Sequence, residues 1–162
     1  MQSNMRLIDK FFRRRGRSRR DFDLELPGGP WQENHEPSHY SYNTDDGREQ
    51  VTISVAYSKQ PLDTPHLMIG VLELVAVRQR PFLTLSEGAA RFEEVRAKTA
   101  PGRVDVVLDG IVSDQVQFRV LLQGRPDRTV SATYLEYAPL SAGDAFSARA
   151  NEVLAGVRVI SS

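Results

Sequence analysis

The residues most suggestive of chemistry stand together as His35-Glu36-Pro37-Ser38-His39. Their letters match H-E-x-x-H, in which two histidines one helical turn apart bind zinc and the glutamate holds the attacking water. Pro37 occupies the interior of this motif, where it removes a helix hydrogen bond and pushes the preceding residue out of helical space. We therefore reject a zinc protease and expect a polar surface loop. The remaining alternative is a loop that brings these side chains near Asp45 or Asp46 for weak metal binding.

Other patterns that carry catalytic or cofactor chemistry are absent from the sequence. It has no glycine-rich phosphate loop, no Gly-x-Ser-x-Gly elbow, no Gly-x-Gly-x-x-Gly fingerprint and no cysteine. The paired carboxylates Asp45/Asp46 and Glu93/Glu94 are neighbours along the chain, which is typical of a solvated surface, and we interpret His66 as structural. We expect a protein that is not an enzyme and holds no cofactor or metal, although dispersed catalytic groups stay possible.

Charge divides the chain into two parts although the whole is neutral. Residues 1–20 carry eight basic side chains and one acidic side chain, a net charge of +7, whereas residues 21–162 carry 13 basic and 20 acidic side chains, a net charge of −7. We therefore expect a basic N-terminal arm over 1–20 and one acidic domain over 21–162. Six arginines form the candidate site for an anionic surface: Arg13, Arg14, Arg15, Arg17, Arg19 and Arg20.

The arm allows more than one interpretation. Apolar side chains at positions 7, 8, 11 and 12 fit a short amphipathic helix ahead of the arginines, which would suit an anionic membrane or a nucleic acid. Alternatively, the arm is a solvated, partly disordered tail that folds back on its own acidic domain. No signal peptide or membrane-spanning run is visible, so we expect a cytoplasmic location.

A long apolar helix is the element that the rest of the chain must position. Thr64 can cap it, Pro65 suits its first turn, and apolar residues recur at helical spacing as far as position 77. We expect Pro81 to end this helix and Leu72 to be buried, so that Leu72→Ala costs about 2–5 kcal/mol.

The other segments predict an antiparallel sheet. Alternating apolar residues favour strands over 22–26, 40–42, 51–57, 104–108, 116–122, 129–135 and 157–160, and residues 86–98 fit a second, shorter helix. Ser141 and Asp144 mark the start of a last helix that ends near Gly156. Strands in runs with helices set apart from them indicate an α+β fold, an antiparallel β-sheet with helices packed against it, in a single domain.

This order of elements resembles a known superfamily. The start Phe22-Asp-Leu-Glu-Leu-Pro27 with Trp31, and the ending Phe146-Ser-Ala-Arg-Ala-Asn-Glu-Val-Leu-Ala-Gly-Val-Arg-Val159, are similar to the PsbP-like and DcrB-like proteins over about residues 22–161. The basic arm and the loop around 28–38 depart from the pattern.

The resemblance implies a non-enzymatic module that binds another protein. Bacterial members of the superfamily accompany secretion systems, some of them as adaptor chaperones for type VI effectors. The resemblance therefore implies a secretion-effector chaperone or adaptor, or an immunity protein, whose acidic domain would suit a basic partner. The alternative function is a peripheral membrane or nucleic-acid-associated protein that acts through the arm. The sequence leaves the oligomeric state undetermined.

Overall fold

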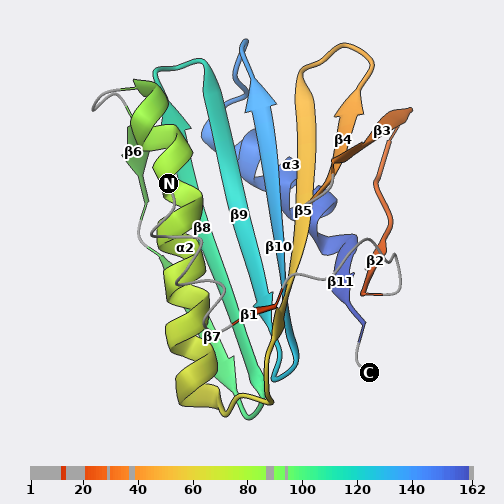
Figure 1. The fold of residues 1–162 in the computed structure, drawn as a ribbon. Coiled ribbons are helices and arrows are strands. Elements are labelled where there is room, and N and C mark those ends of the chain that lie inside the picture. Colours follow the sequence, from red (N-terminus) through yellow and green to blue (C-terminus); the bar gives the residue numbers. More distant parts are fainter. Residues whose placement is uncertain are drawn as a thin grey trace.

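The computed structural model describes residues 12–13, 21–28, 30–36, 39–86, 90–93 and 95–160. Its main element is a nine-stranded antiparallel sheet in the order β3-β4-β5-β10-β9-β8-β6, in which β1 also pairs with β5 and β7 with β8 (Figure 1). A second sheet joins β2 to β11. The strands are β1 Phe12–Arg13, β2 Phe22–Leu24, β3 Trp31–Glu36, β4 His39–Thr44, β5 Glu49–Ser58, β6 Ala90–Phe92, β7 Arg96–Ala100, β8 Arg103–Val112, β9 Val116–Gly124, β10 Arg128–Tyr137 and β11 Val157–Val159; the helices are α2 Thr64–Ser86 and α3 Gly143–Ala155.

The two helices cover opposite faces of the main sheet, α2 in front and α3 behind in Figure 1. Because side chains alternate along a strand, β9 serves both sides. Phe118 and Val120 belong to the core beneath α2, whereas Leu121 packs against the core beneath α3. The expected α+β fold, an antiparallel sheet with helices packed against it, is confirmed.

Helix α2 begins one residue away from its expected cap. The Asp63 carboxylate accepts a hydrogen bond of 3.0 Å from the backbone N–H of His66, and Leu67 N–H donates to the Asp63 carbonyl at 2.9 Å. Asp63 is therefore the capping residue. The Thr64 hydroxyl is used elsewhere, because it accepts a bond of 3.0 Å from the backbone N–H of Gly102.

Two expectations for α2 were wrong. The helix does not end before Pro81 but continues to Ser86, although a proline inside a helix removes a hydrogen-bond donor and crowds the preceding turn. Leu72 is not buried but 42% exposed, because the helix packs on the sheet through Leu67, Val71 and Val75. Helical spacing defines an apolar stripe, but on a helix that is apolar nearly all round it does not select the buried face.

The shorter helix expected over 86–98 is also wrong. β6 and β7 occupy this region, and both pair antiparallel with the edge of β8, with Phe92 opposite Gly110 and Arg96 opposite Val107. The edge of a long strand presents unpaired N–H and C=O groups, and a nearby segment satisfies them best in an extended form. This non-local demand outweighs the local helical spacing.

Strand β8 continues past the expected range 104–108, through Asp109 and Gly110, and runs to Val112. Gly110 lies beneath the Phe118 ring, and a Cβ atom built on it would lie 2.4 Å from that ring. The glycine therefore makes room for an aromatic ring inside the sheet instead of making a turn. The turn follows at Ser113 and Asp114, which have φ angles of 50° and 55°.

The expected arm contributes a strand, contrary to the sequence-based expectation. Phe12 pairs with Ser58 and Arg13 with Tyr57, so β1 is a two-residue strand that pairs with the end of β5. The other arginines of the candidate anionic-surface site lie outside the described residues: Arg14, Arg15, Arg17, Arg19 and Arg20. Of the helix expected over positions 7, 8, 11 and 12, only Phe12 is described, and it lies in β1. The arm's binding role therefore stays a prediction.

Candidate interaction cleft

The small sheet of β2 and β11 provides one wall of a cleft. Beyond the paired residues, Glu25 N–H donates to the Gly156 carbonyl at 2.9 Å, and Ile160 N–H donates to the Asp21 carbonyl at 3.3 Å. A Cβ atom on Gly156 would lie 1.7 Å from the Glu25 carbonyl oxygen. Only glycine permits this approach, so the end of α3 is bound tightly to β2.

An ion-pair cluster fixes the start of β2 to the main sheet. The Asp21 carboxylate lies 3.7 Å from the Arg128 guanidinium, and Arg128 also pairs with Asp127 at 2.8 Å. The same guanidinium lies 5.6 Å from the centre of the Tyr57 ring. Arg128 thus joins the start of β2 to β10 and β5.

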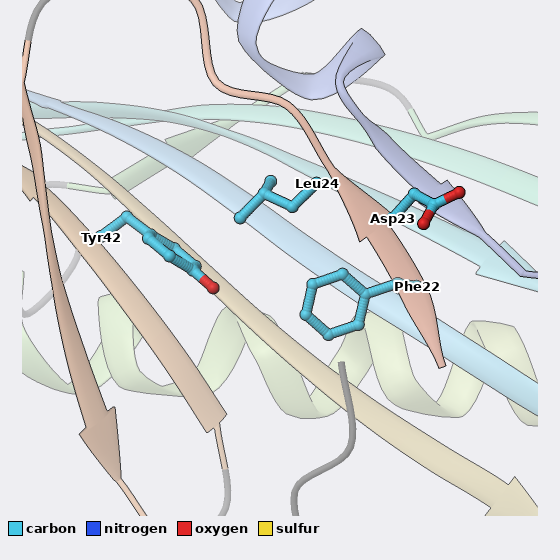
Figure 2. Close-up of a pocket in the computed structure, with 4 residues that line it drawn as sticks. All are labelled: Phe22, Asp23, Leu24 and Tyr42. Atoms are coloured by element: carbon cyan, nitrogen blue, oxygen red, sulfur yellow. The ribbon is translucent and has the colours of Figure 1, made fainter. Parts of the chain in front are cut away.

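The cleft lies between β2 and β4 and has a volume of about 280 Å³ (Figure 2). Phe22, Asp23, Leu24 and Tyr42 line it. Phe22 and Leu24 point from β2 toward the side of Tyr42, whereas Asp23 points away from it. Phe22 and Tyr42 are buried, Leu24 is half-buried and Asp23 is exposed, so the cleft has an apolar interior and a polar mouth.

Aromatic contacts hold this interior rigid. Phe22 packs edge-on against Tyr40, with 5.2 Å between ring centres. The Tyr42 hydroxyl donates to the Glu33 carboxylate at 3.1 Å, and the Trp31 indole N–H donates to the Pro27 carbonyl at 3.0 Å. Because the rings are fixed by packing and by hydrogen bonds, the cleft is preformed.

The surroundings of the cleft are acidic. Asp23 and Glu25 are exposed on β2 and just after it, and Glu33 lies opposite Tyr42. Arg158 is the guanidinium beside them; it stands opposite Asp23 in the strand pairing and lies 3.9 Å from Glu25. The exposed carboxylates of Asp23 and Glu25 share Arg158, so this side of β2 favours a positively charged partner.

A second cavity, of about 540 Å³, lies where α3 begins, among β6, β8 and β9. Three carboxylates line it, those of Glu93, Asp109 and Asp144. Asp109 accepts two hydrogen bonds of 2.6 and 2.8 Å from Arg119. Arg119 in turn donates to the Ser147 hydroxyl at 2.9 Å and to the Asn151 side chain. The hydrogen bonds that Arg119 donates to Asp109 raise the pKa of Arg119, although burial lowers it. This network attaches α3 to the sheet and leaves neither Asp109 nor Arg119 available for acid–base chemistry.

A third network joins residues far apart in the chain. Glu49 accepts a hydrogen bond of 2.7 Å from the Tyr134 hydroxyl and one of 2.7 Å from the Arg149 guanidinium. Burial raises the pKa of Glu49, but the bonds from Arg149 and Tyr134 outweigh burial and leave that pKa lowered. The pair therefore remains charged and ties α3 to β5.

The histidines of the H-E-x-x-H letters do not share a helix. They belong to the hairpin β3–β4, where residue 35 stands opposite Tyr40 and residue 39 opposite Glu36. These two pairs are neighbours along the hairpin, so the two histidine positions belong to opposite faces of it. The loop expected here is largely strand. Within the described residues, no group of three or more His, Asp or Glu side chains is placed to hold a metal ion.

The remaining candidate residues lie apart from one another. His66 bonds to Asp63 at 2.6 Å at the start of α2. Asp45 accepts from the Gln32 amide at 2.9 Å, and Asp46 accepts from the Thr44 hydroxyl at 2.7 Å in the turn before β5. Glu93 follows β6, and residue 94 lies outside the described residues. The sequence predicted strands at Phe22, Leu24 and Tyr42, but no pattern in it indicated that these residues meet in a cleft.

Comparison with known proteins supports the fold. No family model matches the sequence, and no curated protein matches it as a relative. The structure is similar to the solution structure of cyanobacterial PsbP (CyanoP) from Synechocystis sp. PCC 6803, with a TM-score of 0.62 and 10% sequence identity, over 93% of this chain and 94% of that one. The chain therefore has the PsbP-like fold that the sequence suggested. None of the described helices has both the length and the apolar character needed to cross a membrane.

Proposed function

We propose that this chain is a non-enzymatic module that binds another protein by accepting one of its side chains in the cleft between β2 and β4. The observation that carries the proposal is the preformed apolar interior made by Phe22, Leu24 and Tyr42, opening between acidic residues. An anchor side chain that fills a rigid pocket is the usual centre of a protein interface.

The size of the cleft favours a side chain over a free small molecule. Its 280 Å³ lies just below the range of about 300–1,000 Å³ typical of small-molecule sites. The interior holds two apolar side chains and one phenol, which suits an aliphatic or aromatic side chain. In the networks around Asp109 and Glu49, the polar groups form hydrogen bonds with one another, which fits a structural role for each network.

Charge indicates the kind of partner. Residues 21–162 carry a net charge of −7, Asp23 is the charged residue that lines the cleft, and Glu33 stands opposite Tyr42 in the strand pairing. A segment with an apolar residue between lysines or arginines matches both the interior and its surroundings. Complementary charge of this kind speeds and orients association.

The finer function that we propose is that of a bacterial secretion-effector chaperone or adaptor, or an immunity protein, acting in the cytoplasm. Both roles require one partner protein to be recognised and neither requires catalysis. They rest on the resemblance of the beginning and the end of the sequence to PsbP-like and DcrB-like proteins, and the cleft supplies a place for the partner.

A peptide-display selection with the full chain as bait tests the binding role. We expect enrichment of peptides that place an apolar residue between basic ones, and we expect a synthetic peptide of that pattern to bind more slowly as salt rises from low to physiological concentration. Leu24→Asp places a charge inside the half-buried cleft wall and should abolish binding of that peptide. Tyr137→Asp, at an exposed site on the end of β10, is the matched control and should bind normally.

Two results would contradict the proposal. One is an enriched peptide whose affinity is unchanged by Leu24→Asp while the variant keeps its melting temperature. The other is the absence of any enriched peptide together with salt-sensitive binding of the full chain to anionic vesicles or DNA that is lost when residues 1–20 are removed. The second result would favour the alternative function, in which the basic arm acts.

A further inference from the structure

The cavity at the start of α3 is large enough to hold a small organic molecule. Its volume is about 540 Å³, and small-molecule sites typically measure about 300–1,000 Å³. Residues that stand opposite each other in an antiparallel pair direct their side chains to the same face of a sheet, and two such rows form the floor. One row joins Arg91, Ile111 and Gln117, and the other joins Glu93 to Asp109. The first turns of α3 form the opposite wall.

Gln117 brings an unused hydrogen-bond acceptor to this cavity. The residue is 7% exposed, and its amide nitrogen donates to the Glu136 carboxylate at 2.7 Å and to the Ser141 carbonyl at 3.0 Å. Both partners are acceptors, so the nitrogen must face them and the amide oxygen must point elsewhere. No group in the described part of the chain donates a hydrogen bond to this oxygen. A nearly buried acceptor without a donor favours a ligand that carries one.

The charged residues of the lining leave an excess of negative charge. Asp109 is bound in the network described above, and Arg91 lies 3.9 Å from the carboxylate of Asp114. Glu93 and Asp144 are exposed, and neither forms an ion pair with another described residue. These two carboxylates therefore remain available, and a cavity lined by charge of one sign attracts the opposite charge.

The apolar side chains of the lining exclude a bare ion as the best occupant. Phe146 is 6% exposed, and its ring stacks on Tyr134 with 5.8 Å between the ring centres. Ile111 is half-buried beside it in the lining. The described residues include no group of three or more His, Asp or Glu side chains placed to hold a metal ion. Free acceptors together with a fixed apolar wall suit a positive group on an apolar body.

We propose that this cavity binds a small organic amine. Its protonated nitrogen donates to the carboxylates of Glu93 and Asp144 and to the amide oxygen of Gln117, and its apolar body packs against Ile111 and Phe146. An ammonium group has three donors and no acceptor, which matches a site made of acceptors. The cavity adjoins β6 at one edge of the main sheet, whereas the cleft adjoins β4 near the other edge, so this proposal does not rest on the proposed function.

Titration calorimetry of the full chain at neutral pH tests the ligand with three probes of similar shape: 2-phenylethylamine, 2-phenylethanol and 3-phenylpropionate. The amine should bind more tightly than the alcohol by about tenfold or more, because only the amine is charged and forms charge-assisted hydrogen bonds. The propionate should not bind, because Glu93 and Asp144 repel it.

A double variant tests the residues. Glu93→Gln with Asp144→Asn removes both charges and keeps both shapes, so the dissociation constant of the amine should rise about tenfold or more. The matched control, Glu152→Gln with Asp45→Asn, changes two exposed carboxylates outside the cavity and should bind the amine normally. Melting temperatures show that both proteins remain folded.

Amide NMR spectra of the full chain locate the amine. Its addition should shift the signals of Ile111 and Ser147 and leave those of β2 unchanged. The proposal would be overturned by no binding of the amine at millimolar concentration, by equal affinity for the amine and the alcohol, by an unchanged affinity in the double variant, or by shifts confined to β2. Tighter binding of 3-phenylpropionate would also overturn it and would assign an anionic ligand to Arg91.

Discussion

At the scale of single residues, the buried polar side chains of the described networks satisfy one another. Glu49 is the clearest case, because its carboxylate receives the Tyr134 hydroxyl and the Arg149 guanidinium while its side chain is 22% exposed. A charge placed this far from water is stable only when its partners are fixed. The network therefore positions α3 and gives the fold a dependence on pH.

We expect Glu49→Gln to lower the free energy of unfolding at pH 7 by about 1–3 kcal/mol, the range for a lost hydrogen bond to a charged group. The pKa of Glu49 is lowered in the folded protein, so its contribution is complete above the unfolded value of about 4.3. It is lost as the pH falls through the lower folded value. Urea titrations of both proteins from pH 7 to pH 3 measure this, and a difference that grows toward low pH would contradict the prediction.

At the scale of elements, α2 and the segment after it show how the sheet decides between local alternatives. The sheet selects Leu67, Val71 and Val75 as the buried face of α2, and it draws residues 90–100 into two edge strands. In contrast, α3 buries Phe146, Ala150, Val153 and Leu154, the residues that helical spacing predicted. That helix has one apolar side, so its orientation follows from the sequence.

The two faces of α2 should respond differently to truncation. Leu67→Ala removes a fully buried side chain and should cost about 2–5 kcal/mol. Leu72→Ala, measured in dilute protein, should cost less than about 0.5 kcal/mol because the side chain is exposed. Chemical denaturation of the two variants compares them directly, and equal losses would mean that the helix is oriented differently.

At the scale of the whole molecule, two features set the surfaces available to partners: the opposite charges of the arm and the domain, and the covering of each face of the sheet by a different helix. The acidic cleft lies with α3 on one face and the outward side of α2 on the other. The arm carries +7 and meets the domain at β1, which pairs with the end of β5 over two residues.

Removal of residues 1–20 should leave a folded domain. Among the described contacts, this removes the short pairing of Phe12 and Arg13 with β5, so the melting temperature should fall by only a few degrees. Thermal unfolding of a chain starting at Asp21 provides the measurement. A fall of more than about 10 °C, on the order of 2 kcal/mol for a domain of this size, would show that the arm is part of the core.

The sequence by itself determined those elements whose residue pattern fits only one kind of secondary structure. Alternation of apolar side chains predicted β5, β9 and β10, and the run of strands beside helices predicted the antiparallel α+β class. The charge division and the unsuitability of Pro37 for a zinc helix were also readable from local chemistry.

Only the tertiary structure decided the rest, because those features depend on which distant segments meet. Residues 86–98 fit a helix locally, but β6 and β7 lie there instead because the edge of β8 needed partners. Asp109-Gly110 is a sequence typical of a turn, but Gly110 lies inside a strand, where the Phe118 ring covers it. The cleft joins Phe22 to Tyr42, and the Glu49 network spans 100 residues to Arg149. A local sequence pattern cannot predict such pairs. The free energy that selects them comes from burial and hydrogen bonding between segments that are remote in the chain.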